Sequence, residues 1–184
     1  TFFYLGMIYT NQGRLAEAKE ALKKALLLNA KDERVLYRLG VLYEKLGQED
    51  LAQSEYKKAL HLKPEAKLVR LRLGQLYAKT NRFSEAEEQF KKVLEFDPES
   101  EGARNNLGAL YYQTNKFRKA EVEYLRVIKI WPRKVQAYNN LGVLYYEMKK
   151  FKDAENIYRK VLELDPNYIE TINNLGVLYL AMNK

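Results

Sequence analysis

The sequence lacks cysteine and contains a single histidine, His61, in its 184 residues. The absence of cysteine excludes disulfides and thiolate chemistry, and a lone histidine does not make a zinc site. The chain also has no glycine-rich phosphate loop and no serine-centred catalytic motif. We therefore expect a protein that is not an enzyme and that uses neither a metal nor a cofactor.

Long apolar runs are missing too. None approaches the roughly 20 residues that a membrane-spanning helix needs, and a composition of 47% hydrophobic and 30% charged residues is that of a folded chain. The chain begins with TFFYLGMIY and ends with LAMNK, both inside an amphipathic pattern. We expect a segment of a longer protein whose targeting signals lie elsewhere. The compartment is not identified, with the cytoplasm slightly favoured.

One short pattern recurs with a spacing of 34 residues. A leucine–glycine pair is followed by tyrosine three residues later, by alanine twelve later, and by an aromatic residue or leucine sixteen later. A fixed period of this length is typical of repeat architectures. The six glycines are Gly6, Gly40, Gly74, Gly108, Gly142 and Gly176.

Each repeat predicts two helices joined by a tight turn. Leucine and tyrosine at helical offsets make one apolar face, and the glycine lets a second helix approach, with the recurrent alanine as its small partner. The turn requires a left-handed residue. The candidates for it are Gly13, Gly47, Asn81, Asn115 and Asn183, with Lys149 as the exception. After the second helix, Asp97–Pro98 and Asp165–Pro166 are predicted to cap and begin the next helix.

This pattern resembles the tetratricopeptide repeat over essentially the whole chain. The resemblance implies an all-α, right-handed superhelical solenoid of antiparallel helix pairs, with first helices lining a concave groove. The repeats fall at residues 1–32, 33–66, 67–100, 101–134 and 135–168, with a partial sixth at 169–184, in one domain. The pattern departs from the family where Arg70 and Arg104 replace a large aromatic residue four positions before the glycine.

By this resemblance, a stripe of each first helix faces the groove, and in repeats two and three it is basic. Guanidinium groups in such a stripe suit a carboxylate or an acidic side chain, and solvated cations are the alternative. Tyrosines near the groove are either anchors for apolar ligand side chains or packing between repeats. The candidates are Arg34, Arg38, Arg72 and Lys79, with Tyr37, Tyr112 and Tyr146 as the aromatic residues.

The stripe changes to amides further along the chain. Asn-Asn-Leu-Gly occurs three times, and its second asparagine falls on the stripe as Asn106, Asn140 and Asn174, with Gln113 nearby. An amide donates and accepts, which matches the backbone of an extended peptide. Similar ladders hold peptide backbone in O-linked N-acetylglucosamine transferases. The alternative is that these residues hydrate the groove or bond between helices, and the first asparagine is expected to border the next repeat.

The net charge is +8, and residues 101–134 contain eight basic and three acidic residues. Most of the cations fall on the predicted second helix and so on the convex surface. They favour either an anionic partner or a solvated outer face, and nucleic acid is the less expected partner. The patch consists of Lys116, Arg118, Lys119, Arg126 and Lys129.

Together these features predict a non-catalytic protein-interaction scaffold that binds an extended peptide in its groove. Two alternatives stay open: a substrate-docking arm of a larger, glycosyltransferase-like enzyme, and a binder of RNA or an anionic surface. We also expect self-association through the helix of the partial sixth repeat, because Leu178, Leu180 and Met182 there lack a second helix to cover them.

Overall fold

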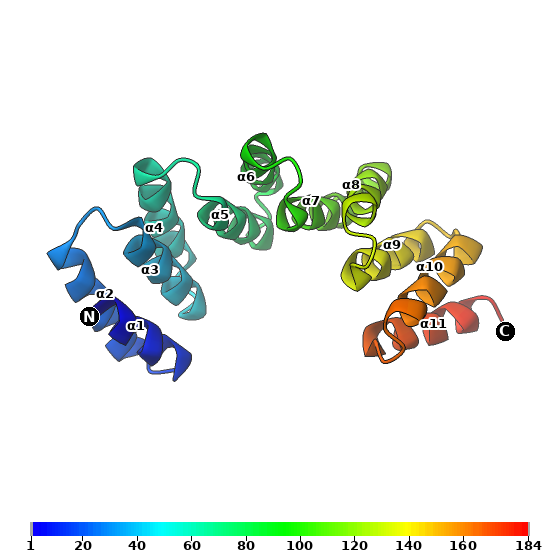
Figure 1. The fold of residues 1–184 in the computed structure, drawn as a ribbon, viewed down its shortest axis with the longest axis horizontal. Helices are drawn as coiled ribbons and strands as arrows, with labels where there is room; N and C mark the ends of the chain where they lie inside the picture. Colours follow the sequence, from blue (N-terminus) through cyan, green and yellow to red (C-terminus); the bar gives the residue numbers. More distant parts are fainter. Residues whose placement is uncertain (1, 184) are drawn as a thin grey trace. The chain divides into compact units, whose positions relative to one another are not determined.

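The computed structural model describes residues 2–183, which form eleven helices and, within that range, no strand. This confirms the all-α prediction and the pairing of helices (Figure 1). The helices are α1 (Phe2–Asn11), α2 (Leu15–Leu28), α3 (Glu33–Lys45), α4 (Glu49–Leu62), α5 (Lys67–Lys79), α6 (Phe83–Phe96), α7 (Glu101–Gln113), α8 (Phe117–Ile130), α9 (Val135–Glu147), α10 (Phe151–Leu164) and α11 (Ile169–Ala181).

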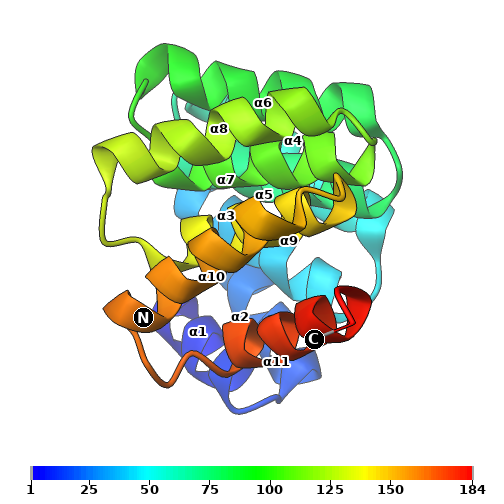
Figure 2. The same cartoon turned by 90° about the vertical axis from the view of Figure 1, so that its right-hand side faces the viewer.

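The chain divides into two compact units, residues 1–96 and 97–184. We call them the N-terminal unit, with helices α1 to α6, and the C-terminal unit, with α7 to α11. Within each unit, a first helix packs against the second helix of its own repeat, and that second helix packs against the next first helix. Figure 2 shows this in the C-terminal unit, where α10 lies between α9 and α11. The single domain over 1–184 stays a prediction.

The repeated glycine is where the two helices of a repeat meet most closely. A Cβ atom added to Gly40, Gly108 or Gly142 would lie 2.4 Å from the ring of Tyr56, Tyr124 or Tyr158, respectively. Those rings are buried. We predicted that alanine would be the small partner of the glycine, but the aromatic ring itself fills the space, because its edge needs the room that a missing Cβ leaves.

The turn between the two helices uses a left-handed residue in every repeat. Asn81 and Asn115 have φ values of 59° and 55°, and Lys149, which we predicted to be the exception, has a φ of 59°. The Lys149 and Lys150 amides donate to the carbonyls of Tyr146 and Tyr145 at 2.9 Å. These bonds impose the left-handed conformation on a residue that does not prefer it.

The Asp–Pro pairs do not begin helices, so that prediction is wrong. Helix α11 begins at Ile169, and Asp165 instead ends α10, its amide donating to Val161 at 2.8 Å. Tyr168 then donates its amide to the Asp165 carbonyl at 3.2 Å, which closes a turn around the proline. Because proline also fits the turn positions that fix φ near −65°, its presence does not distinguish a turn from a first helical residue.

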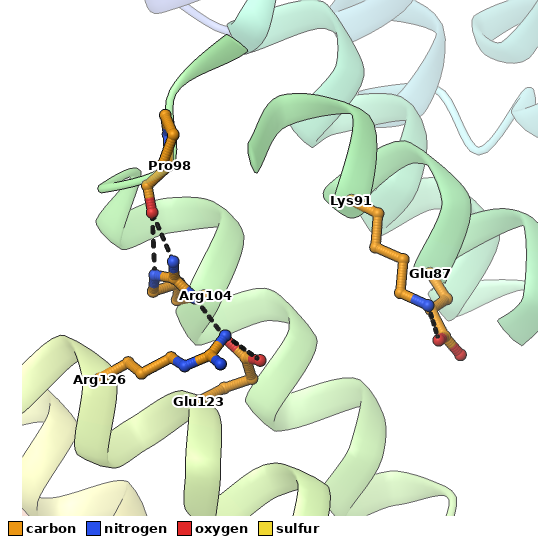
Figure 3. Close-up of polar contacts among 6 residues, drawn as sticks. All are labelled: Glu87, Lys91, Pro98, Arg104, Glu123 and Arg126. Atoms are coloured by element: carbon orange, nitrogen blue, oxygen red, sulfur yellow. Dashed lines mark hydrogen bonds and ion pairs between the residues drawn. The ribbon is translucent and has the colours of Figure 1, made fainter. Parts of the chain in front are cut away.

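The arginines that replace the usual aromatic residue are integrated into the packing. Arg104 donates from Nε to the Pro98 carbonyl at 3.1 Å and from Nη1 to Glu123 Oε2 at 2.8 Å (Figure 3). Each side chain of this ion pair is only 11% exposed. The Arg126 guanidinium also approaches Glu123, at 3.5 Å. One carboxylate therefore serves two guanidinium groups.

The same bond to a proline carbonyl recurs in other repeats. Arg70 Nε donates to Pro64 at 2.7 Å and Nη1 donates to Gln89 Oε1 at 3.1 Å. In repeat five the residue is the aromatic Tyr138, and its hydroxyl donates to Pro132 at 3.2 Å. Arginine and tyrosine at this position therefore make the same hydrogen bond to the turn that precedes the first helix.

Candidate functional site

The first helices of the N-terminal unit border a hollow of about 440 Å³ beside Tyr37. The Tyr37 ring lies 6.1 Å from the Tyr56 ring and is half-buried. The Arg38 guanidinium lies 5.7 Å above the Tyr37 ring. Leu68, at the start of α5, lines the hollow and is 66% exposed. The hollow thus combines an aromatic wall and an uncovered aliphatic side chain with four cations and two carboxylates, which are Arg34, Arg38, Lys63, Lys67, Glu33 and Glu65.

Two of the four predicted groove cations already have a carboxylate partner. Arg34 forms a two-point ion pair with Asp32, at 2.7 and 3.0 Å. The Arg34 guanidinium therefore holds the pKa of Asp32 below its usual value. Lys79 Nζ lies 2.8 Å from Glu49 Oε1, and this contact raises the pKa of Lys79.

The other two, Arg38 and Arg72, are in no ion pair within the described part of the chain. The Tyr37 hydroxyl beside Arg72 raises the pKa of that guanidinium. Tyr37 thus has one arginine near its hydroxyl and the other over its ring face. A guanidinium without a carboxylate partner has donors to offer to an acidic ligand.

The three stripe asparagines of the C-terminal unit are half-buried, and each takes part in internal hydrogen bonding. Asn106 Nδ2 donates to the Gly102 carbonyl at 2.8 Å. Asn140 Oδ1 accepts from Gln136 Nε2 at 3.0 Å, and Asn174 Nδ2 donates to Asn139 Oδ1 at 3.2 Å. Among residues 2–183, Asn140 Nδ2 and Asn174 Oδ1 make no hydrogen bond. Asn140 can therefore donate a hydrogen bond to a ligand, and Asn174 can accept one.

The first asparagine of each pair serves packing where the next repeat covers it. Asn139 is 2% exposed, and its Oδ1 accepts from the Thr171 hydroxyl at 2.7 Å as well as from Asn174. Asn105 Oδ1 is buried without a hydrogen bond among the described residues. At the spacing that places Thr171 against Asn139, the chain has Ala137 against Asn105, which has no hydroxyl to donate.

The groove tyrosines of the C-terminal unit pack inside their own repeats. The Tyr112 ring lies 6.1 Å from Phe117, and the Tyr146 ring lies 5.7 Å from Phe151. Burial, with a smaller contribution from Glu147, raises the pKa of Tyr112. Each tyrosine is half-buried, so it closes the hairpin and presents only part of its ring to a ligand.

The predicted basic patch lies on α8 and the residue before it. Lys116 and Lys119 place their ammonium groups 6.0 and 5.5 Å from the Tyr111 ring. Arg118, Arg126 and Lys129 are exposed. All five cations are therefore solvent-accessible, four of them on α8 and Lys116 at its N-cap.

The last helix exposes part of the apolar face that we predicted. Leu180 is 77% exposed and Met182 is half-buried. Leu178, however, is fully buried in a cluster with Ala154 and Tyr158, so its prediction was wrong. It points to α10, whereas the uncovered side of α11 carries Ile172 and Val177.

Residues 2–183 contain neither a metal-holding cluster of side chains nor a membrane-spanning helix. No group of three or more histidine or acidic side chains is placed to hold a metal ion. None of the described helices is long and apolar enough to cross a membrane.

Three profiles of the tetratricopeptide repeat match the sequence at residues 6–47, 37–101, 108–149 and 135–168. These ranges together cover most of the chain, and the match at 135–168 coincides with the predicted fifth repeat. The chain belongs to the tetratricopeptide repeat family. No curated protein matches the sequence.

Solved tetratricopeptide repeat structures have the same fold. A tetratricopeptide repeat protein from Parabacteroides merdae is 27% identical over 99% of this chain and 71% of its own, with a TM-score of 0.83. PilF from Pseudomonas aeruginosa is 20% identical over 99% and 83%, with a TM-score of 0.83. YrrB, described as a tetratricopeptide repeat protein with an unusual peptide-binding site, is 19% identical over 95% and 90%, with a TM-score of 0.74.

Two residues of the candidate site were not predicted from the sequence. Thr171 and Tyr168 lie outside the predicted stripe, yet Thr171 holds Asn139 and the Tyr168 hydroxyl donates to Gln136 at 2.6 Å. Thr171 could have been predicted as a partner of Asn139, since it follows Asn139 by 32 residues, which is close to one repeat. No sequence signal marks Tyr168, because lysine and other residues occupy its equivalent positions.

Proposed function

We propose that this chain is a non-catalytic scaffold whose first helices bind extended segments of other proteins. In the N-terminal unit the ligand is an acidic segment with an apolar side chain. The observation that carries the proposal is the hollow beside Tyr37, where Arg38 has no carboxylate partner among the described residues and Leu68 is exposed. An acidic group pairs with Arg38 and Arg72, and the apolar side chain covers Leu68.

In the C-terminal unit the proposed ligand contact is to backbone rather than to side chains. Asn140 Nδ2 donates to a peptide carbonyl, and Asn174 Oδ1 accepts from a peptide amide. Their internal hydrogen bonds to Gln136 and Asn139 fix which end of each amide is presented. Contacts of this kind tolerate many sequences, because every residue except proline offers the same two backbone groups. The peptide-binding site described for YrrB supports the general role.

The test begins with selection of ligands for the wild-type chain from a random peptide library. The affinities of the selected peptides are then measured calorimetrically with Arg38→Ala/Arg72→Ala and with Asn140→Ala/Asn174→Ala. We expect enrichment in acidic residues and a loss of about tenfold or more for the arginine pair, because hydrogen bonds to charged groups contribute about 1.5–3 kcal/mol each.

The matched control is Lys57→Ala/Lys91→Ala, which removes the same charge from two second helices of the same unit. Its affinity should stay close to that of the wild type. Equal losses in the two double variants would mean that net charge alone attracts the peptide. Unchanged affinity in both groove variants would exclude the first helices as the binding surface.

A further inference from the structure

The exposed surface of α8 differs from that of every other second helix in the chain. Val122 and Leu125 lie at its centre and are 46% and 45% exposed. At the equivalent positions, the other second helices have only polar or charged residues. These are Glu20, Ser54, Glu88 and Asn156 for Val122, and Lys23, Lys57, Lys91 and Arg159 for Leu125.

The acidic residues of α8 are turned away from this surface. Glu123 is buried against Arg104, at 2.8 Å. Glu121 accepts from the Tyr145 hydroxyl at 2.9 Å and lies 3.8 Å from Lys150. Burial and the Glu121 carboxylate raise the pKa of Tyr145 to about 12, so the phenol keeps its proton and this hydrogen bond near neutral pH.

Helix α6 shows what the same positions do in another repeat. There Lys91 pairs with Glu87 at 2.6 Å (Figure 3), and in α10 Arg159 pairs with Glu155 at 2.8 Å. In α8 the position of that cation is Leu125. Its acid, Glu121, faces α9 and the following turn instead. The exchange replaces a surface ion pair with an exposed aliphatic side chain.

Cations lie on the same helix, and the only tryptophan of the chain follows its last residue. Every exposed charged side chain within the described helix α8 is basic: Arg118, Lys119, Arg126 and Lys129. Trp131, just beyond the helix, is 47% exposed. With Arg104, Arg126, Lys129 and one carboxylate, Glu99, it lines a hollow of about 690 Å³.

We propose that this face of α8 binds the surface of an anionic lipid bilayer. Val122, Leu125 and Trp131 enter the boundary between headgroups and acyl chains, while the surrounding cations pair with lipid phosphates and carboxylates. Tryptophan is suited to that boundary because its ring is apolar and its N–H is polar. Nucleic acid would use the cations but gain little from exposed valine and leucine, so the aliphatic pair favours lipid.

The test uses Trp131 as its own reporter. The wild-type chain is mixed with vesicles of phosphatidylcholine alone, or of phosphatidylcholine with phosphatidylserine, and Trp131 emission and vesicle flotation are measured. We expect a blue shift and flotation only with the anionic vesicles, and weaker binding as salt is raised. No flotation with anionic vesicles, or equal flotation with both kinds, would overturn the proposal.

Two variants distinguish the apolar from the electrostatic part of the interaction. Each introduces residues that other repeats have at the same positions, so we expect the fold to be kept. Val122→Ser/Leu125→Lys copies α4 and adds a positive charge, yet we expect about tenfold weaker vesicle binding because aliphatic burial is lost. Lys119→Glu/Lys129→Glu copies α6 and should abolish binding. Circular dichroism melts confirm that the variants fold.

The matched control is Leu27→Ser/Leu28→Ser, which removes two exposed leucines from α2 and should leave vesicle binding unchanged. Loss of binding in this control would assign the contact to α2 and contradict the proposal. A gel-shift assay with RNA gives the other decisive outcome. Retardation that Val122→Ser/Leu125→Lys preserves, without vesicle binding, would make the face a nucleic-acid surface.

Discussion

The N-terminal and C-terminal units share one packing framework but differ at the positions where successive first helices meet. Three residues before the repeated glycine, the N-terminal unit has Phe3, Tyr37 and Leu71, and the C-terminal unit has Asn105, Asn139 and Asn173. The glycine notch and the buried ring opposite it are the same in Gly40 and Gly142. The packing of the two helices within a repeat therefore accepts either an apolar side chain or an amide at this position.

The difference determines what each groove presents. In the N-terminal unit, Tyr37 lies beside Arg38 and near Arg72, so the surface offers cations next to an aromatic ring. In the C-terminal unit, Asn139 holds Asn174 by a hydrogen bond, so the surface offers an oriented amide. In the C-terminal unit, the residue that packs between repeats thus also orients the stripe asparagine of the next repeat.

The largest expected effect tests the shared framework. Gly40→Ala and Gly142→Ala each force a Cβ atom to within 2.4 Å of a buried tyrosine ring. We expect both to lower the free energy of unfolding by up to about 3 kcal/mol, as measured by urea denaturation. Gly176→Ala is the control, because among the described residues its Cβ meets nothing within 4 Å beyond its chain neighbours and the backbone of its own helix. Unequal losses at Gly40 and Gly142 would mean that the two units do not share one framework.

A smaller effect separates the two asparagine interfaces of the C-terminal unit. Asn139→Ala leaves the buried Thr171 hydroxyl without its acceptor and should cost about 1–2 kcal/mol of unfolding free energy. Asn105→Ala should cost less, because its buried Oδ1 has no hydrogen bond among the described residues. Thermal denaturation of both variants measures the contrast. A loss at Asn105 as large as that at Asn139 would contradict the assigned roles.

The smallest effect is a gain of stability. Ala137→Thr places a hydroxyl at the position that Thr171 occupies relative to Asn139, so it should donate to Asn105 Oδ1. We expect stabilisation of about 0.5–1 kcal/mol in urea denaturation. Ala137→Val has nearly the same shape without the hydroxyl, and valine occupies the equivalent positions Val35 and Val69. If valine stabilises as much as threonine, packing rather than the hydrogen bond is responsible.

Much of the fold follows from the period in the sequence, because the framework residues repeat every 34 positions and each has one packing role. The errors arise where one residue type has two stable uses. Proline fits either a turn or the first turn of a helix, and backbone hydrogen bonds hold Lys149 in a conformation that its side chain does not favour. Leu178 was misplaced because helical periodicity does not state which neighbour covers a face.

The candidate site was less accessible to sequence reasoning. The stripe was predictable in position, but the pairing of Arg34 with Asp32 and of Lys79 with Glu49 depends on side-chain placement. The internal bonds of Asn140 and Asn174 likewise come from neighbours that the repeat does not fix. The structure thereby narrows the available cations to Arg38 and Arg72, and the available amide groups to one donor and one acceptor.

The most direct test is a set of double-mutant cycles that combine changes in the peptide with changes in the groove. A selected peptide is prepared with its acidic residue changed to alanine, and separately with a backbone amide changed to an ester. Calorimetric affinities of each are measured against Arg38→Ala/Arg72→Ala and Asn140→Ala/Asn174→Ala. We predict that the acid change couples to the arginine pair and the ester change to the asparagine pair, each by about 1 kcal/mol or more. Additive effects in both cycles would contradict the claim that the two units bind charge and backbone, respectively.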